Sequence, residues 1–189
     1  MPMSPQPSDL TALSLAEVAR LAASAKLPPV GRWNPAHCGD SEMRIARDGT
    51  WYHQGAPITR PEMVRLFSTI LRRERDGTHD LVTPVEKLSI TVEDAPFRAV
   101  EMKADGDGAD ATLAFRLNTD ELIVAGPENP LRFAQIGEEP RPYLAVRAGL
   151  EALIARALFY DLAERATEGP GGLLGVWSSG AFFAMETCS

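Results

Sequence analysis

The sequence predicts an α+β fold of two similar small domains, in which β-hairpins pack on amphipathic helices. Three observations support this prediction. A mid-chain stretch alternates apolar and polar residues with the period of a half-buried strand. Two other segments repeat apolar residues at helical spacing. A Gly-x-Trp hairpin pattern occurs in each half of the chain, whose 189 residues leave room for one large domain or two small ones.

Composition limits the partners and the compartment. The net charge of -7 argues against nucleic acid and against anionic membranes as partners. Of the 19 basic residues 16 are Arg, which suits carboxylate and phosphate ligands, although a GC-rich genome is the simpler explanation for most of them. The two cysteines show no metal or disulfide spacing. We see no signal peptide and no apolar run of about 20 residues, so we expect a cytoplasmic protein.

The N-terminal part is predicted to carry one docking helix. Residues 1–8 are rich in Pro and Ser, and we expect them to be disordered. Ser14 and Glu17 form a capping box, because each side chain can satisfy the free backbone N–H of the other residue. The apolar stripe that follows is thin, and Pro28 and Pro29 end the helix. This helix is therefore expected to dock on a larger body.

A second helix is predicted in the first half of the chain. Thr59 is a suitable N-cap and Pro61 fits the first turn. Apolar residues continue at helical spacing as far as Leu71. We expect Asp76-Gly77 to end this helix.

The central stretch, Leu81 to Phe97, contains the clearest strand. Leu88, Ile90 and Val92 alternate with polar residues there. The further predicted strands cover residues 97–102, 112–117, 122–125, 131–134, 143–146, 173–177 and 181–185. Residues 150–166 carry a broad apolar stripe and are predicted to form the longest helix.

A short sequence echo links the two halves. Residues 49–56 and 175–181 both contain Gly-x-Trp followed by Gly-Ala, beside an amphipathic helix. In the first copy, residues 43–45 and 51–53 form a hairpin around Asp48-Gly49. Chance is the alternative explanation, because Gly and Trp are common in hairpins. The resulting division is a tail with the docking helix at 1–30, a first α+β domain at 31–86 and a second at 87–189.

Seven segments form a recognisable pattern. They are residues 48–53, 55–60, 64–67, 81–84, 86–87, 90–97 and 175–180. With these segments the chain from about Arg32 onward resembles an uncharacterised proteobacterial family known as a domain of unknown function. The resemblance implies two α+β domains with repeated motifs, a cleft between them and a small ligand of nucleotide type. It implies no particular activity.

Charged residues at the ends of the central strand are the first candidate site. They are Glu86, Lys87, Glu93 and Asp94. Two carboxylates beside a lysine can perform acid–base chemistry or hold a metal ion. A solvated strand end is the simpler interpretation, because adjacent strand residues point to opposite faces and charged side chains are mostly exposed. No residue spacing indicates a metal site.

Three arginines are candidates for holding an anion: Arg60, Arg65 and Arg98. Arg60 is favoured because it lies at the predicted start of a helix, where free N–H groups also attract anions. Ordinary surface arginines are the alternative interpretation.

Aromatic residues beside the first hairpin complete the candidate set. Trp51 and Tyr52 can form a wall against a base, although packing against the adjacent helix is the simpler interpretation. His53 has no partner at metal or triad spacing. The glycines of residues 104–110 are flanked by Asp, which would repel phosphate.

These observations favour a cytoplasmic protein that binds or senses a small, nucleotide-like anion in signal transduction. Arg60 and Arg98 would contact the anion, with Trp51 or Tyr52 as the aromatic wall. One alternative is a hydrolase or transferase that uses Glu86, Lys87, Glu93 and Asp94 on a phosphate-bearing substrate. Another is a protein-interaction module. The sequence identifies neither a cofactor nor an oligomeric state.

Overall fold

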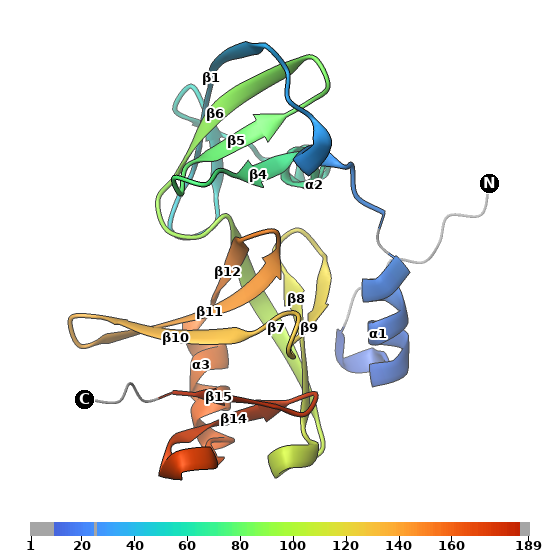
Figure 1. The fold of residues 1–189 in the computed structure, drawn as a ribbon, viewed down its shortest axis with the longest axis vertical. Helices are drawn as coiled ribbons and strands as arrows, with labels where there is room; N and C mark the ends of the chain where they lie inside the picture. Colours follow the sequence, from blue (N-terminus) through green and yellow to red (C-terminus); the bar gives the residue numbers. More distant parts are fainter. Residues whose placement is uncertain (1–9, 25, 186–189) are drawn as a thin grey trace.

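Two sheet-rich domains, one towards each end of the molecule, make up the fold (Figure 1). The structure is a computed structural model that describes residues 10–24 and 26–185. The prediction of disorder for residues 1–8 lies outside the described residues. Strands dominate both domains and short helices accompany them, in agreement with the α+β class. No helix in the described ranges is long and apolar enough to cross a membrane.

The first domain is a six-stranded sheet with one helix. Its strand order is β3-β2-β1-β6-β5-β4, and the central β1·β6 pair is parallel. Its elements are η2 (Val30–Arg32), β1 (His37–Ile45), β2 (Trp51–His53), β3 (Ala56–Pro57), α2 (Pro61–Thr69), β4 (Leu71–Arg73), β5 (His79–Val82) and β6 (Glu86–Val92). Met43, Ile45 and Trp51 are buried, and the ring of Trp51 stacks on Phe67 of α2. This packing joins the helix to the sheet.

The second domain is a larger six-stranded sheet. Its order is β10-β11-β12-β7-β8-β9, again with a parallel central pair, β12·β7. Its strands are β7 (Phe97–Asp105), β8 (Thr112–Leu117), β9 (Leu122–Val124), β10 (Leu131–Ile136), β11 (Glu139–Arg147) and β12 (Leu150–Ile154), with η3 (Gly108–Asp110) between β7 and β8. After them come α3 (Arg156–Glu164) and a small sheet of β13 (Thr167–Glu168), β14 (Leu174–Ser178) and β15 (Ala181–Ala184), with η4 (Pro170–Gly172) between β13 and β14.

The predicted central strand is confirmed, but the domain boundary is corrected. Ile90 of β6 is buried, and Leu88 and Val92 are partly buried on the same side of the strand. β6 pairs with β1 and β5 in the middle of the first sheet. A boundary after Glu86 would therefore cut this sheet, and the chain instead passes between the domains at residues 93–96. The paired residues of β1 lie nearly fifty positions earlier, for example His37 opposite Glu86, so local periodicity could not reveal the pairing.

Both longer helix predictions are also corrected. Residues 150–166 are not one helix, because residues 150–154 form β12 beside β7 and α3 starts only at Arg156. The earlier helix ends at Thr69, and Asp76-Gly77 is the turn of the β4–β5 hairpin. The N-cap of this helix is Arg60 rather than Thr59. In each case strand pairing over long distances in the sequence outweighs an apolar pattern that fits either structure.

The two copies of the Gly-x-Trp echo lie in different structural settings. The first is part of the β1–β2–β3 region of a six-stranded sheet, whereas the second belongs to the separate β13-β14-β15 sheet. Trp51 is buried and Trp177 is only partly buried. Both predicted hairpins are confirmed. What the two large sheets share is the parallel pair at their centre.

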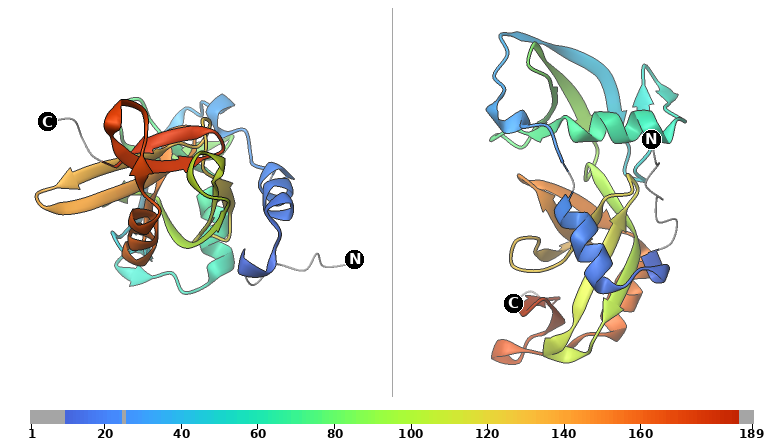
Figure 2. Two further views of the ribbon diagram at one scale, coloured as in Figure 1. Left: turned by 90° about the horizontal axis from the view of Figure 1, so that it is seen from below. Right: turned by 90° about the vertical axis from the view of Figure 1, so that its right-hand side faces the viewer.

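The docking helix is confirmed on the second domain. In α1 (Leu15–Ser24), which follows η1 (Leu10–Ala12), the Ser14 N–H donates to Glu17 Oε2 at 2.7 Å and the Glu17 N–H donates to Ser14 Oγ at 3.2 Å. The helix packs beside β9, and Leu10 and Val18 form a small core with Ala114 of β8. Figure 2 shows the helix alongside the second domain and away from the first sheet.

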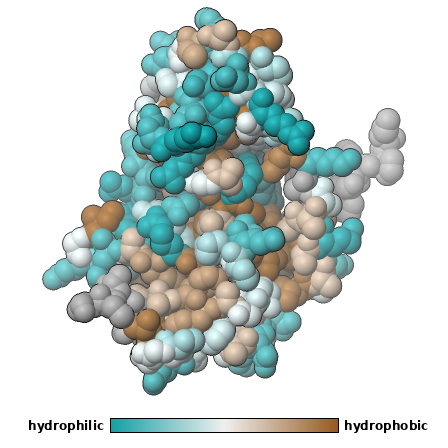
Figure 3. All heavy atoms as spheres, in the orientation of Figure 1, coloured by the Kyte–Doolittle hydropathy of each residue, from teal (hydrophilic) through white to brown (hydrophobic). Residues whose placement is uncertain are grey.

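The two domains meet through apolar packing and through arginine contacts. One apolar core includes buried residues of both sheets. Arg147 donates to Ser68 O at 3.1 Å, Arg73 donates to Gly149 O at 3.1 Å, and Arg65 pairs with Asp120. Figure 3 shows mainly hydrophilic side chains over the first domain and an apolar area on the second, where β14 and β15 lie.

Candidate functional site

Four arginines converge on a hollow of about 520 Å³ beside the domain junction, here called the arginine hollow. They are Arg47, Arg98, Arg141 and Arg156. The carboxylates among its described lining residues are Asp48 and Glu139. Because the guanidinium groups outnumber the carboxylates, the hollow favours negatively charged ligands.

The first domain supplies one edge of the arginine hollow through its β1–β2 turn. Arg47 and Asp48 lie in this turn, and Gly49 follows with a φ of 90°. On the other side, Arg98 of β7 directs Nη1 towards Arg47 O at 3.5 Å. Asn118 accepts a hydrogen bond from the Arg98 N–H at 3.0 Å. A Cβ at position 49 would lie 3.2 Å from Asn118 Nδ2, so glycine suits this close approach.

Arg141 is the most deeply held of the four arginines. Its side chain is 10% exposed, and Nη1 lies 3.1 Å from Asp94 Oδ2. The Tyr143 hydroxyl donates to the other oxygen of Asp94 at 2.6 Å. Burial, followed by this hydrogen bond, raises the pKa of Tyr143 to about 12. Asp94 and Tyr143 therefore fix the position of the Arg141 guanidinium.

One hydrogen-bond donor of the Arg141 guanidinium has no partner among the described residues. This donor is the Nε–H, which is buried. A buried unsatisfied donor costs roughly 1–3 kcal/mol in general. Because this nitrogen is itself buried, a ligand in the hollow would reach the Nη groups of Arg141 rather than its Nε.

The N-terminus of α3 adds a further positive contribution. Arg156 is the first residue of this helix, and the N-cap Ala155 makes no side-chain capping bond. The free N–H groups of a helix N-terminus attract anions. Phe159 and Tyr160, one turn later, line the same hollow, and the Tyr160 side chain is exposed. The hollow therefore combines an anion-binding end with aromatic rings.

The four charged residues of the central strand do not form one site. Lys87 lies 3.8 Å from Asp80, whose carboxyl pKa is raised mainly by burial, and Glu86 is at the same end of β6. Glu93 and Asp94 follow the other end, roughly 20 Å away along an extended strand. Their separation removes the constellation on which the enzyme alternative rested.

Glu93 and Asp94 also have separate partners. Glu93 accepts a backbone hydrogen bond from Arg47 at 2.9 Å and pairs with Arg44, and these contacts lower the pKa of its carboxyl. Asp94 instead faces Arg141. The two carboxylates therefore do not share a site, as expected, although both lie in the bend after β6 rather than in the strand.

The remaining candidates lie in several places. Trp51 is in the first core, and Tyr52 lies under the Arg44 guanidinium at 4.3 Å from the ring centroid. His53 and Arg60 are exposed on the first domain. Of the ten candidates, all within the described ranges, Arg98 is the one that lines the arginine hollow.

Sequence reasoning missed three of the four arginines. Arg47 precedes the predicted Asp48-Gly49 turn, and its position next to a turn was the available signal. Arg141 stands between two prolines on β11, without a local motif. Arg156 was hidden because the predicted helix began six residues too early.

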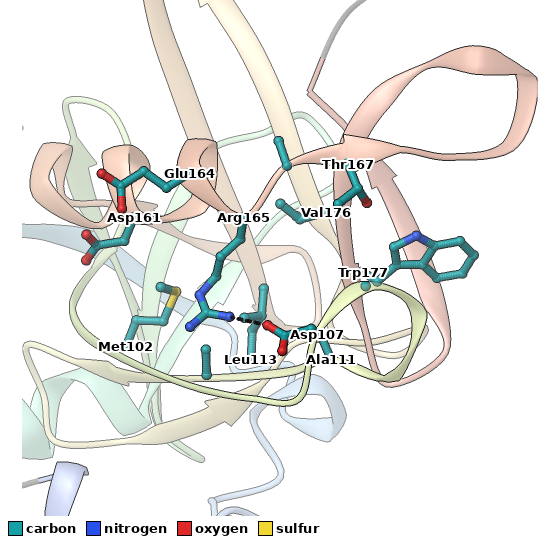
Figure 4. Close-up of a pocket in the computed structure, with 13 residues that line it drawn as sticks. Met102, Asp107, Ala111, Leu113, Asp161, Glu164, Arg165, Thr167, Val176 and Trp177 are labelled. Atoms are coloured by element: carbon teal, nitrogen blue, oxygen red, sulfur yellow. Dashed lines mark ion pairs between the residues drawn. The ribbon is translucent and has the colours of Figure 1, made fainter.

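A second hollow, of about 570 Å³, lies at the opposite end of α3 and is here called the acidic hollow (Figure 4). Its floor includes Met102, Leu113 and Val176. Asp161 and Glu164 line it from α3, and Arg165 extends across it towards Asp107, 3.9 Å away. Carboxylates predominate here, so an anion is disfavoured. Among the described residues, no group of three or more His, Cys, Asp or Glu side chains is arranged to hold a metal ion.

The fold and the arginine hollow define a two-domain, sheet-rich protein with a basic pocket beside the domain junction. Two family models match the chain: "Domain of unknown function (DUF1285), N-terminal domain" over residues 28–95 and "Protein of unknown function (DUF1285), C-terminal domain" over residues 96–185. The first model ends at residue 95 and the second begins at residue 96, which agrees with the passage of the chain between the domains at residues 93–96.

Two solved structures are similar to the chain. A DUF1285 family protein from Silicibacter pomeroyi DSS-3 is 50% identical, with a TM-score of 0.80, covering 90% of this chain and 94% of that one. A DUF1285 family protein from Shewanella baltica OS155 is 24% identical, with a TM-score of 0.52, covering 65% of this chain and 91% of that one, and it supports the fold alone. No curated protein matches the chain. The chain belongs to the DUF1285 family, which confirms the predicted resemblance.

Proposed function

We propose that this chain binds a small anionic molecule of nucleotide type in the arginine hollow and acts as a cytoplasmic sensing protein in signal transduction. The observation that carries the proposal is the convergence of Arg47, Arg98, Arg141 and Arg156 on one hollow. A volume of about 520 Å³ is also within the range of small-molecule pockets.

The arrangement suggests how such a ligand would lie. Arg98, Arg141 and Arg156 would together hold the phosphate, with Arg141 as the fixed charge among them. The N–H groups at the start of α3 would contribute to the same anion. Phe159 and Tyr160 would face the base or sugar, since aromatic rings stack on bases. The ligand would touch both domains, because Arg47 comes from the first and the other three arginines from the second.

A thermal-shift screen against nucleoside mono-, di- and triphosphates tests the proposal. A ligand present at about a hundred times its Kd stabilises the folded state by about 2.7 kcal/mol, which is readily measured. Arg98→Gln and Arg156→Gln should each remove most of the shift. Arg165→Gln, in the acidic hollow, is the matched control and should retain it.

Two results would overturn the proposal. One is the lack of any melting-temperature shift in the wild-type protein across the panel. The other is an equal loss in Arg156→Gln and Arg165→Gln, which would indicate a general charge effect rather than binding in the arginine hollow.

A further inference from the structure

The Glu139 carboxylate bridges two arginines of the arginine hollow. Its Oε2 lies 3.2 Å from Arg141 Nη2, and its Oε1 lies 3.6 Å from Arg156 Nη2. Each oxygen thus faces a different guanidinium. A bound phosphate would place its oxygens between the same two groups. Glu139 therefore lies where the proposed ligand's anionic group would bind.

Glu139 can leave this position without disturbing Arg141. It is the first residue of β11, directly after the turn at Gly137 and Glu138, and its side chain is 51% exposed. Arg141 stays fixed by its separate pair with Asp94. Ion pairs of this exposure are worth only a small amount of free energy, so a stronger anion can displace the carboxylate.

We infer that Glu139 is a built-in competitor, whose carboxylate occupies the anion position of the arginine hollow and lowers its affinity for every incoming anion, so that phosphate dianions displace it and monocarboxylates scarcely do. A monocarboxylate would only exchange one carboxylate for another. A phosphate dianion brings a second charge and a third oxygen, and so gains more from Arg141 and Arg156 than Glu139 loses. The inference rests on the proposed function, since it concerns the same hollow.

Titration with inorganic phosphate and with acetate tests the inference. Both anions would be titrated at about pH 8, where phosphate is mostly dianionic, at constant ionic strength, with the melting temperature as readout. Wild type would be compared with Glu139→Gln. Glu138→Gln is the matched control, because it removes the same charge from the exposed neighbouring position in the same turn.

In wild type, phosphate should bind and acetate should bind much more weakly. Glu139→Gln should bind phosphate roughly fivefold more tightly and acetate by no larger a factor, because displacing Glu139 costs every anion the same free energy and the charge that the variant removes repels a dianion more. Glu138→Gln should keep the wild-type affinities.

The outcomes separate the two proposals. An unchanged phosphate affinity in Glu139→Gln, with phosphate or nucleoside phosphates still bound, overturns the role of Glu139 and leaves the proposed function intact. An equal change in Glu138→Gln and Glu139→Gln also overturns it, because the effect would then come from net charge. If neither wild type nor Glu139→Gln binds phosphate or any nucleoside phosphate, both proposals fail.

Discussion

The two ends of α3 lie in hollows of opposite charge. Arg156 begins the helix in the arginine hollow, whereas Asp161 and Glu164 lie near its end in the acidic hollow. Helices are stabilised by acidic residues at the N-terminus and by basic residues at the C-terminus. α3, described over its whole length, has no acidic residue in its first turn and no basic residue in its last. The basic residue at the start of α3 and the acidic residues near its end therefore do not serve to stabilise the helix.

The two hollows also differ in how firmly their arginines are held. Arg141 and Asp94 are both about nine-tenths buried, and Tyr143 supports them. In the acidic hollow, Arg165 faces the fully exposed Asp107 at 3.9 Å. Preorganised charges bind ligands better than mobile ones, because less ordering is needed on binding. The arginine hollow is thus the better-built site.

The largest expected effect comes from Arg141→Ala. Removing one partner of a buried ion pair leaves the other uncompensated, so unfolding should become easier by about 3 kcal/mol. Anion binding should be lost as well. Urea denaturation measures the first effect, with Arg165→Ala as the control that changes stability little. A loss below about 1 kcal/mol for Arg141→Ala would contradict the difference between the two hollows.

A smaller effect on the free energy of unfolding is expected from the ionisation of Tyr143 at alkaline pH. Its pKa is raised from 10.0 to about 12 in the folded protein, so the folded state holds this proton more tightly than the unfolded state. The associated stability is fully present below about pH 10 and is lost as the pH rises towards about 12. Wild type should lose about 2 kcal/mol more than Tyr143→Phe across this window.

Chemical denaturation at a series of pH values, repeated with both proteins, checks this prediction. Subtracting the free energy of unfolding of Tyr143→Phe from that of wild type at each pH removes the contribution of all other titrating groups. If the free energies of unfolding of the two proteins fell in parallel as the pH rose, Tyr143 would not be held against Asp94 as described.

The smallest expected effects on stability come from neutralising one charged side chain at each end of α3. Arg156→Gln and Glu164→Gln should each raise the free energy of unfolding by about 0.3 kcal/mol, because each removes a charge that opposes the helix dipole. The two variants should differ in function, since Arg156→Gln would lose anion binding and Glu164→Gln would keep it. Denaturation and thermal shift on the same preparations measure both properties. Retained anion binding in Arg156→Gln would remove the functional difference between the two ends.

Much of the local structure was predictable from sequence. Ser14 and Glu17 form the expected capping box, Asp48-Gly49 turns the expected hairpin, and Leu88, Ile90 and Val92 line the inner side of β6. These features depend on interactions between residues that are close in the chain. Turn chemistry and alternation are therefore sufficient to predict them.

Tertiary structure alone decided the domain boundary, the start of α3 and the arginine hollow. β6 joins the first sheet through β1, and residues 150–154 become a strand through β7. Both are parallel pairings between distant segments, which no local pattern reports. Arg47, Arg98, Arg141 and Arg156 come from four separate elements and meet only because those pairings bring the elements together. The sequence thus determined the individual strands and turns, and long-range strand pairing determined which charges share a hollow.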